Sequence, residues 1–170
     1  MPTSFSAAFN DIVQMPKAAI LLFAASAASM ILAFIVEYGF HHEPCELCLL
    51  QRVPFVLVIL MAGLACLRPM RPYAWILLGL CGLALLTGSG VAIFHTGVER
   101  HWWLGTSGCT IRPLHGSSVE DLRTELLHMA VARCDQISVT FLGLTMANYN
   151  VPFSLALALF AFAAARRARP

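Results

Sequence analysis

Four stretches of predominantly apolar residues limit what this chain can fold into. They cover residues 17–36, 49–67, 73–95 and 147–165, and a helix needs about 20 such residues to cross a bilayer. Of the 170 residues, 59% are hydrophobic and 12% are charged, whereas the apolar share of a soluble domain is near half. The sequence therefore predicts one all-α membrane domain over residues 1–170, a four-transmembrane-helix bundle.

The first apolar stretch is longer than the apolar core of a signal peptide, and no convincing cleavage site precedes Glu37. We expect it to be retained as the first span.

The basic residues near the ends of the spans predict the orientation of the bundle. The 37–48 loop contains no Lys or Arg, and positive residues concentrate on the cytoplasmic side of membrane proteins. Both termini are therefore expected in the cytoplasm, with loops 37–48 and 96–146 on the other side. The net charge of +2 reflects this topology and does not indicate nucleic-acid binding. The basic residues concerned are Lys17, Arg68, Arg71, Arg166, Arg167 and Arg169.

Four of the six cysteines fall in the two loops expected outside the cytoplasm: Cys45 and Cys48 in the first, Cys109 and Cys134 in the second. Disulfides form and persist in oxidising compartments. A Cys109–Cys134 disulfide would stabilise the fold by roughly 3 to 4 kcal/mol through chain entropy. A purely structural role could therefore explain this pair. Structure alone does not explain a CxxC pair at the start of a helix.

The CxxC pair precedes the second apolar stretch, and residues three apart on a helix are neighbours, so the two cysteines can form a disulfide. Backbone N–H groups at a helix N-terminus carry partial positive charge, and Arg52 follows Cys48 by four residues. Both effects favour a thiolate. We predict that Cys48 is the reactive sulfur of a redox pair at the membrane surface. Cys66 and Cys81, within the spans, are interpreted as small apolar residues.

The 96–146 loop is expected to contain a short amphipathic helix. Ser117 to Glu120 has the pattern of a capping box, and apolar residues then recur at helical spacing as far as Ala130. Such a helix lies on the membrane surface or packs on its own loop.

Several of these motifs, in this order and together with the number of spans, resemble the bacterial disulfide bond formation protein B (DsbB) family over about residues 16–165. The residues that carry the resemblance are the CxxC followed by Gln51-Arg52, Phe94-His95-Thr96, Cys109, Cys134-Asp135-Gln136 and Phe141-Leu142-Gly143-Leu144-Thr145-Met146.

The resemblance implies a thiol:quinone oxidoreductase in the bacterial inner membrane. A reduced, DsbA-like periplasmic protein of thioredoxin fold would attack the Cys109–Cys134 disulfide at Cys109. Cys134 would then exchange with Cys45, which leaves Cys48 as the thiolate beside a membrane quinone, ubiquinone or menaquinone. All four cysteines are expected to be catalytic.

Four further residues are expected to bind the quinone. Arg52 would stabilise negative charge that develops on the quinone oxygens, and His95 would donate a hydrogen bond or a proton. Met146 matches a family position near the ring, and Gln51 stands where some members have an acidic residue.

Three alternatives remain open at this point. His41, His42, Cys45 and Cys48 offer four possible metal ligands within eight residues, as in a metal-binding membrane protein. The chain could also be a DsbB relative that serves another thiol partner, or a non-catalytic four-span scaffold with structural disulfides. The scaffold alternative predicts that Cys48→Ser leaves function intact.

Overall fold

The computed structural model describes residues 13, 14, 16–106, 109, 118–120, 123, 133–135 and 140–169. Four long helices dominate it: α2 (Lys17–Phe34), α3 (Glu46–Cys66), α4 (Ala74–Glu99) and α6 (Met146–Arg167). A π-helical turn η1 (Ile35–Gly39) continues α2, and a 3-10 helix η2 (Arg68–Tyr73) joins α3 to α4. All four long helices are long and apolar enough to cross a membrane, which confirms the expected fold class.

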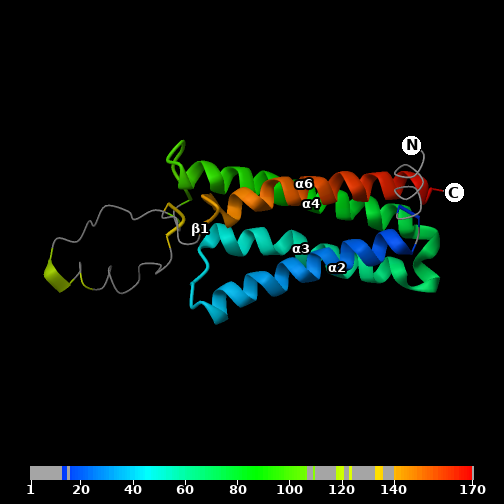
Figure 1. Cartoon of the computed structure of the whole chain (residues 1–170), viewed down its shortest axis with the longest axis horizontal. Helices are drawn as coiled ribbons and strands as arrows, with labels where there is room; N and C mark the ends of the chain where they lie inside the picture. The colour runs from blue at the N-terminus through cyan, green and yellow to red at the C-terminus, as the bar shows by residue number, and fades with distance from the viewer. Residues whose placement is uncertain are drawn as a thin grey trace.

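The four helices run side by side along the long axis of the molecule, with α3 next to α2 and α4, and α6 along α4 (Figure 1). The start of α2 and the end of α6 lie at the same end of the bundle. The chain between η1 and α3, the end of α4 and the start of α6 lie at the opposite end. The CxxC pair at the start of α3, the end of α4 and the start of α6 therefore lie at one end of the bundle, which we call the site end.

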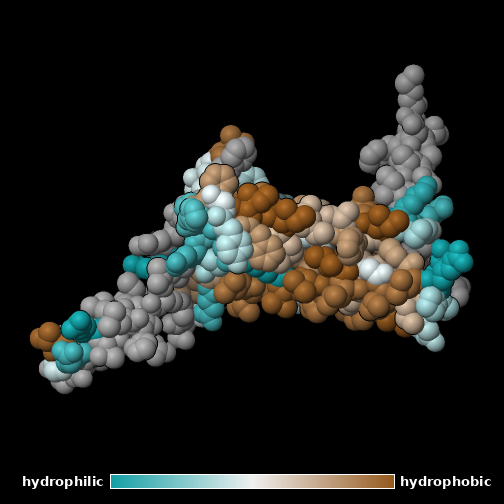
Figure 2. All heavy atoms as spheres, turned by 90° about the horizontal axis from the view of Figure 1, so that it is seen from below, coloured by the Kyte–Doolittle hydropathy of each residue, from teal (hydrophilic) through white to brown (hydrophobic). Residues whose placement is uncertain are grey.

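On the face seen in Figure 2, apolar residues form a belt across the middle of the bundle, and hydrophilic residues gather at both ends. Large side chains such as Ile20, Leu60 and Leu159 are more than half exposed on this belt. An exposed apolar belt on a helical bundle matches a lipid environment, in which polar residues concentrate at the two interfaces.

Small residues fill the space between the helices. Buried alanines occur on α2, α3 and α6, and they let helix backbones approach closely. Gly82 of α4 shows how close this approach is: a Cβ there would lie 2.7 Å from the ring of Phe162 on α6. Gly88 likewise allows α4 to pack against Pro54 of α3, with 3.1 Å between a Cβ built at Gly88 and the proline ring.

A short hairpin with two residues in each strand leads into the last helix. Strand β1 (Thr140–Phe141) pairs antiparallel with β2 (Leu144–Thr145), Thr140 opposite Thr145. Leu142 and Gly143 both have positive φ, as the tight turn between the strands requires. Thr145 then caps α6 by accepting the N–H of Asn148 (3.3 Å). The hairpin thus fixes where α6 begins.

The amphipathic helix expected around residues 117–130 lies largely outside the described residues, which include only 118–120 and 123 of that stretch. It stays a prediction.

Candidate functional site

Cys45 is the N-cap of α3, and its sulfur lies at the positive end of that helix. Sγ of Cys45 accepts the backbone N–H of Cys48 at 3.4 Å, and the two Sγ atoms are 2.9 Å apart. Both thiols are free, and Cys45 is buried whereas Cys48 is partly exposed. A sulfur that receives helix N–H groups is stabilised as a thiolate.

His95 approaches the same sulfur from α4. Its Nε2 lies 3.6 Å from Sγ of Cys45 and 3.7 Å from Oε1 of Glu99. The hydrogen bond with the Cys48 thiol, the contact with His95 and the Cys48 backbone N–H hold the pKa of Cys45 well below its usual range, although burial opposes this shift. When both cysteines of the CxxC pair are reduced, these contacts therefore favour the thiolate on Cys45.

The sequence predicts a thiolate at Cys48, because Cys48 was expected at the helix N-terminus beside Arg52. In the structure Cys45 is the N-cap and the Arg52 guanidinium pairs with Glu37, so neither effect acts on Cys48 as expected. When Cys45 is bonded to another cysteine, Cys48 is the free sulfur of the pair. The assignment of Cys48 as the sulfur beside the quinone stays a prediction.

Gln51 lies one turn into α3 and is buried against His95. Its Nε2 is 2.7 Å from Nδ1 of His95, and its Oε1 accepts Nδ2 of Asn150 at 2.6 Å. The hydroxyl of Ser154 donates to Oδ1 of Asn150 at 2.8 Å. Sequence reasoning missed Asn150, Ser154 and Glu99. Asn150 and Ser154 are polar residues within an expected apolar span, and such residues face the bundle interior and mark functional sites. Glu99 lies beyond the expected end of its span at residue 95, so this signal does not extend to it.

Arg52, next to Gln51 in the sequence, faces a different neighbour. Its guanidinium pairs with Glu37 at 2.5 Å and covers the ring of Phe34, 5.3 Å from its centroid. Phe34 also lines a shallow apolar groove of about 470 Å³ along the end of α2. A half-buried cation beside an apolar surface is suited to bind a hydrophobic molecule that carries polar oxygens. The groove residues are Ile31, Phe34, Ile35, Tyr38 and Gly39.

Cys109 and Cys134 form a disulfide with a Cα–Cα distance of 4.8 Å, and both are buried. They pack in one apolar cluster with Cys45, and Cys48 packs against it. The two cysteine pairs, far apart in the sequence, therefore meet at the site end. Among the described residues, Leu47 and Val98 also belong to this cluster.

Polar groups border the disulfide. The hydroxyl of Thr106 donates to Oε2 of Glu46 at 2.8 Å and lies 3.2 Å from Sγ of Cys109. Next to Cys134, the guanidinium of Arg133 bonds both carboxylate oxygens of Asp135 and holds the pKa of that carboxyl below its usual range.

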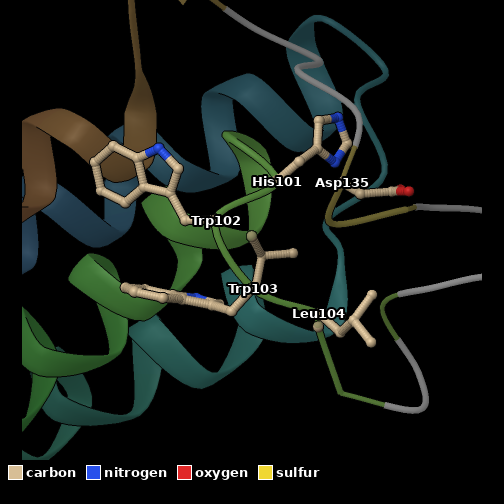
Figure 3. Close-up of a pocket in the computed structure, with 7 residues that line it drawn as sticks. His101, Trp102, Trp103, Leu104 and Asp135 are labelled. Atoms are coloured by element: carbon tan, nitrogen blue, oxygen red, sulfur yellow. The ribbon is translucent and has the colours of Figure 1, made fainter.

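A surface pocket of about 260 Å³ lies beside the disulfide, between the end of α4 and Asp135 (Figure 3). Two tryptophans give it an aromatic wall. The ring of Trp103 stacks on Phe94 and donates to the Phe94 carbonyl at 2.9 Å. Gly97 leaves the space for that ring, since a Cβ there would lie 2.0 Å from it. The lining residues are Val98, His101, Trp102, Trp103, Leu104, Gly105 and Asp135.

The alternative metal site takes a different form from the one expected. Among the described residues, the ligand atoms of Cys45, Cys48 and His95 lie within 4.8 Å of one another. His41 and His42 are exposed and stand outside this group. Met146, expected near a quinone, is the first residue of α6 and is 38% exposed. Its role stays a prediction.

Comparisons with known proteins agree on one family. The family model described as disulfide bond formation protein DsbB matches residues 16–164. A disulfide bond formation protein B from Herminiimonas arsenicoxydans is 31% identical over 147 residues, covering 82% of this chain and 90% of the relative. One from Marinobacter nauticus is 31% identical over 159 residues, covering 88% and 92%. An uncharacterized protein of Rickettsia prowazekii, RP370, is 26% identical over 144 residues, covering 83% and 82%. No solved structure matches the chain.

Proposed function

This chain belongs to the disulfide bond formation protein B (DsbB) family, and from that membership we propose that it reoxidises a DsbA-like periplasmic dithiol protein and passes the electrons to a membrane quinone. The observation that carries the proposal is a buried cluster at the site end in which Cys45 packs with Cys109 and Cys134, while Cys48 packs against it. Disulfide exchange requires direct contact between sulfurs, and this cluster brings the pairs together.

The first step takes place at the Cys109–Cys134 disulfide. A thiolate of the reduced partner attacks Sγ of Cys109, which forms a mixed disulfide and releases Cys134 as a thiolate. The partner's second thiol then breaks the mixed disulfide, so that the partner leaves oxidised. Two electrons and two protons remain on the Cys109/Cys134 pair.

The second step transfers these electrons to the CxxC pair. Cys134 attacks the Cys45–Cys48 disulfide at Cys45, and Cys48 leaves as a thiolate. Cys109 then attacks Cys134 and restores the outer disulfide, which releases Cys45. The N–H of Cys48 and the imidazole of His95 stabilise the sulfur released at Cys45.

A quinone bound near Arg52 would accept two electrons and two protons from Cys45 and Cys48, and their removal would convert the two thiols back to a disulfide. The residues present fit such a molecule, because the Arg52 cation lies beside Phe34 and its apolar groove. Arg52 would stabilise negative charge on an oxygen of the ring. His95, Gln51 and Met146 complete the proposed quinone-binding residues, and ubiquinone and menaquinone are the candidate substrates.

The proposed location is the bacterial inner membrane, with both termini in the cytoplasm and the site end in the periplasm. The positive residues near the start of α2, in η2 and at the end of α6 support this orientation. In this orientation, the proposed membrane spans are those expected from the sequence, at residues 17–36, 49–67, 73–95 and 147–165.

The test uses purified protein, a reduced DsbA-like partner and a soluble quinone analogue, with quinone absorbance and partner thiols followed together. Serine variants of Cys45, Cys48, Cys109 and Cys134 are expected to lose quinone reduction by the partner's thiols. Cys66→Ala serves as the matched control, because Cys66 lies at the far end of α3 and should retain full activity. Full turnover with the partner in Cys109→Ser would refute the proposed entry point.

A metal-binding function is the second candidate, because three ligand atoms of suitable type converge at Cys45, Cys48 and His95. It predicts that one equivalent of Zn²⁺ binds the reduced protein and that the protein does not reduce quinone. A DsbB relative with another thiol partner would instead reduce quinone with simple dithiols and fail with the DsbA-like protein.

A further inference from the structure

A continuous chain of hydrogen bonds links α6, α3 and α4 behind the CxxC pair. It starts at the buried hydroxyl of Ser154, which donates to Asn150 (2.8 Å), and Asn150 donates to Gln51 (2.6 Å). The amide of Gln51 reaches Nδ1 of His95 (2.7 Å). The opposite ring nitrogen, Nε2, faces Cys45. The chain thus ends on the imidazole that contacts the reactive sulfur.

The groups around Nε2 of His95 decide which ring nitrogen carries the hydrogen. Nε2 faces the sulfur of Cys45 (3.6 Å) and the carboxylate of Glu99 (3.7 Å), and both accept hydrogen bonds when ionised. The other oxygen of Glu99 already accepts the hydroxyl of Thr145 at 2.6 Å. Two acceptors therefore require an N–H at Nε2.

A neutral imidazole carries one hydrogen, so an Nε2–H ring must accept at Nδ1. The group that faces Nδ1 must then be a donor. The NH₂ of Gln51 supplies it, which turns the Gln51 oxygen toward the NH₂ of Asn150 and the Asn150 oxygen toward the hydroxyl of Ser154. All bonds of the chain run in one direction, and each acceptor has a donor.

We propose that Gln51, Asn150 and Ser154 are positioning residues that hold His95 in the Nε2–H tautomer, so that His95 donates a hydrogen bond to Cys45 when its sulfur is released as a thiolate. The role in exchange rests on the proposed function, whereas the tautomer itself is independent of it. Buried hydrogen-bonded neighbours fix the tautomer of functional histidines in this way.

The identity of residue 51 is central to this assignment. An amide can present an N–H to Nδ1, whereas a carboxylate can only accept. Gln51→Glu would still accept from Asn150, but its other oxygen would require an N–H at Nδ1. The substitution keeps the size of the side chain but requires the hydrogen of His95 on Nδ1 instead of Nε2. It therefore tests the proposal with little change in packing.

The test is NMR of the reduced, full-length protein in detergent, with ¹⁵N and ¹³C in its histidines. The His95 signals are identified by their loss in His95→Ala. We expect wild-type His95 to carry its hydrogen on Nε2, Gln51→Glu to carry one on Nδ1, and Asn150→Leu to show a mixture of tautomers. Asn148→Leu, on the same helix but outside the chain of hydrogen bonds, is the matched control and should match the wild type.

A wild-type His95 protonated on Nδ1, or an Asn150→Leu variant with an unchanged tautomer, would overturn the proposal. Exchange between the two cysteine pairs, followed by rapid acid quench, should slow by about tenfold in Asn150→Leu, because a charge-assisted hydrogen bond is weakened. Ser154→Thr retains the hydroxyl and should retain the wild-type rate. If the wild type reduced no quinone, the proposed function would fail, while the NMR result would still decide the tautomer.

Discussion

Replacement of His95 by alanine should raise the pKa of Cys45, and the size of the change follows from the hydrogen bond that is lost. A hydrogen bond to a charged group contributes about 1.5 to 3 kcal/mol. Sulfur is a weaker acceptor than oxygen, and Nε2 is shared with the carboxylate of Glu99, so we take the lower value. Since 1.36 kcal/mol corresponds to one pKa unit, the expected rise is about one unit.

The assay is the ultraviolet absorbance of the thiolate as a function of pH in the reduced protein, with the Cys45→Ser curve subtracted. In the wild type the transition should lie below the ordinary cysteine value of about 8.5. In His95→Ala it should move about one unit back toward that value. His42→Ala is the control, because this exposed ring lies in the loop before Cys45 and should leave the transition unchanged.

The same shift predicts how the stability of the reduced protein depends on pH. A thiol whose pKa is lower in the folded state contributes stability that is fully present above the unfolded value and is lost as pH falls through the folded value. The free energy of unfolding should therefore rise with pH up to about 8.5, and less steeply in His95→Ala. A His95→Ala transition within about 0.3 units of the wild type, a difference of about 0.4 kcal/mol, would refute the assigned role of the imidazole.

Two further predictions concern packing and charge. Gly82→Ala should destabilise the bundle by about 1 to 3 kcal/mol, because the new methyl overlaps the Phe162 ring. The matched control is Gly79→Ala, where nothing lies within 4 Å and the helix should gain up to about 1 kcal/mol; equal unfolding curves in mixed micelles for both variants would contradict the close approach of α4 and α6. A double-mutant cycle of Glu37→Gln and Arg52→Gln should give a coupling of about 1 to 2 kcal/mol, above the value for surface pairs, because their side chains are only 19% and 17% exposed. A coupling below about 0.5 kcal/mol would mean that solvent screens the pair.

The spans could be predicted from the sequence because membrane insertion depends on apolar length, which is a local property. The start of α3 was harder to predict from the sequence. The apolar stretch begins at Leu49, but the helix begins at Glu46, so that Cys45 rather than Cys48 occupies the cap. Because the first turn of α3 is polar, the apolar pattern placed the start of the helix three residues too late. The sulfur at the helix N-terminus is therefore that of Cys45 and not that of Cys48.

The neighbours of Gln51 and Arg52 could not be predicted from their positions in the sequence. These adjacent residues point about 100° apart on a helix, one toward His95 on α4 and the other toward Glu37 at the end of α2. Which groups they meet depends on which helices pack against each face of α3. From the sequence both residues are assigned to the same quinone. In the structure Gln51 also contacts Asn150 and His95, which its position in the sequence did not indicate, and its contact with a quinone stays a prediction.

The π-helical turn Ile35–Gly39 has a consequence for how the chain tolerates changes in length. A turn of this kind accommodates one residue more than an α-helical turn. Deletion of Val36 would let the helix close to ordinary winding, and the residues that follow would keep nearly the same place around the axis, because the wide turn and the lost residue cancel. The same deletion in the regular part of α2 would rotate every later residue by about 100° and separate Glu37 from Arg52. The wide turn is therefore where this helix tolerates a change of length without losing its ion pair.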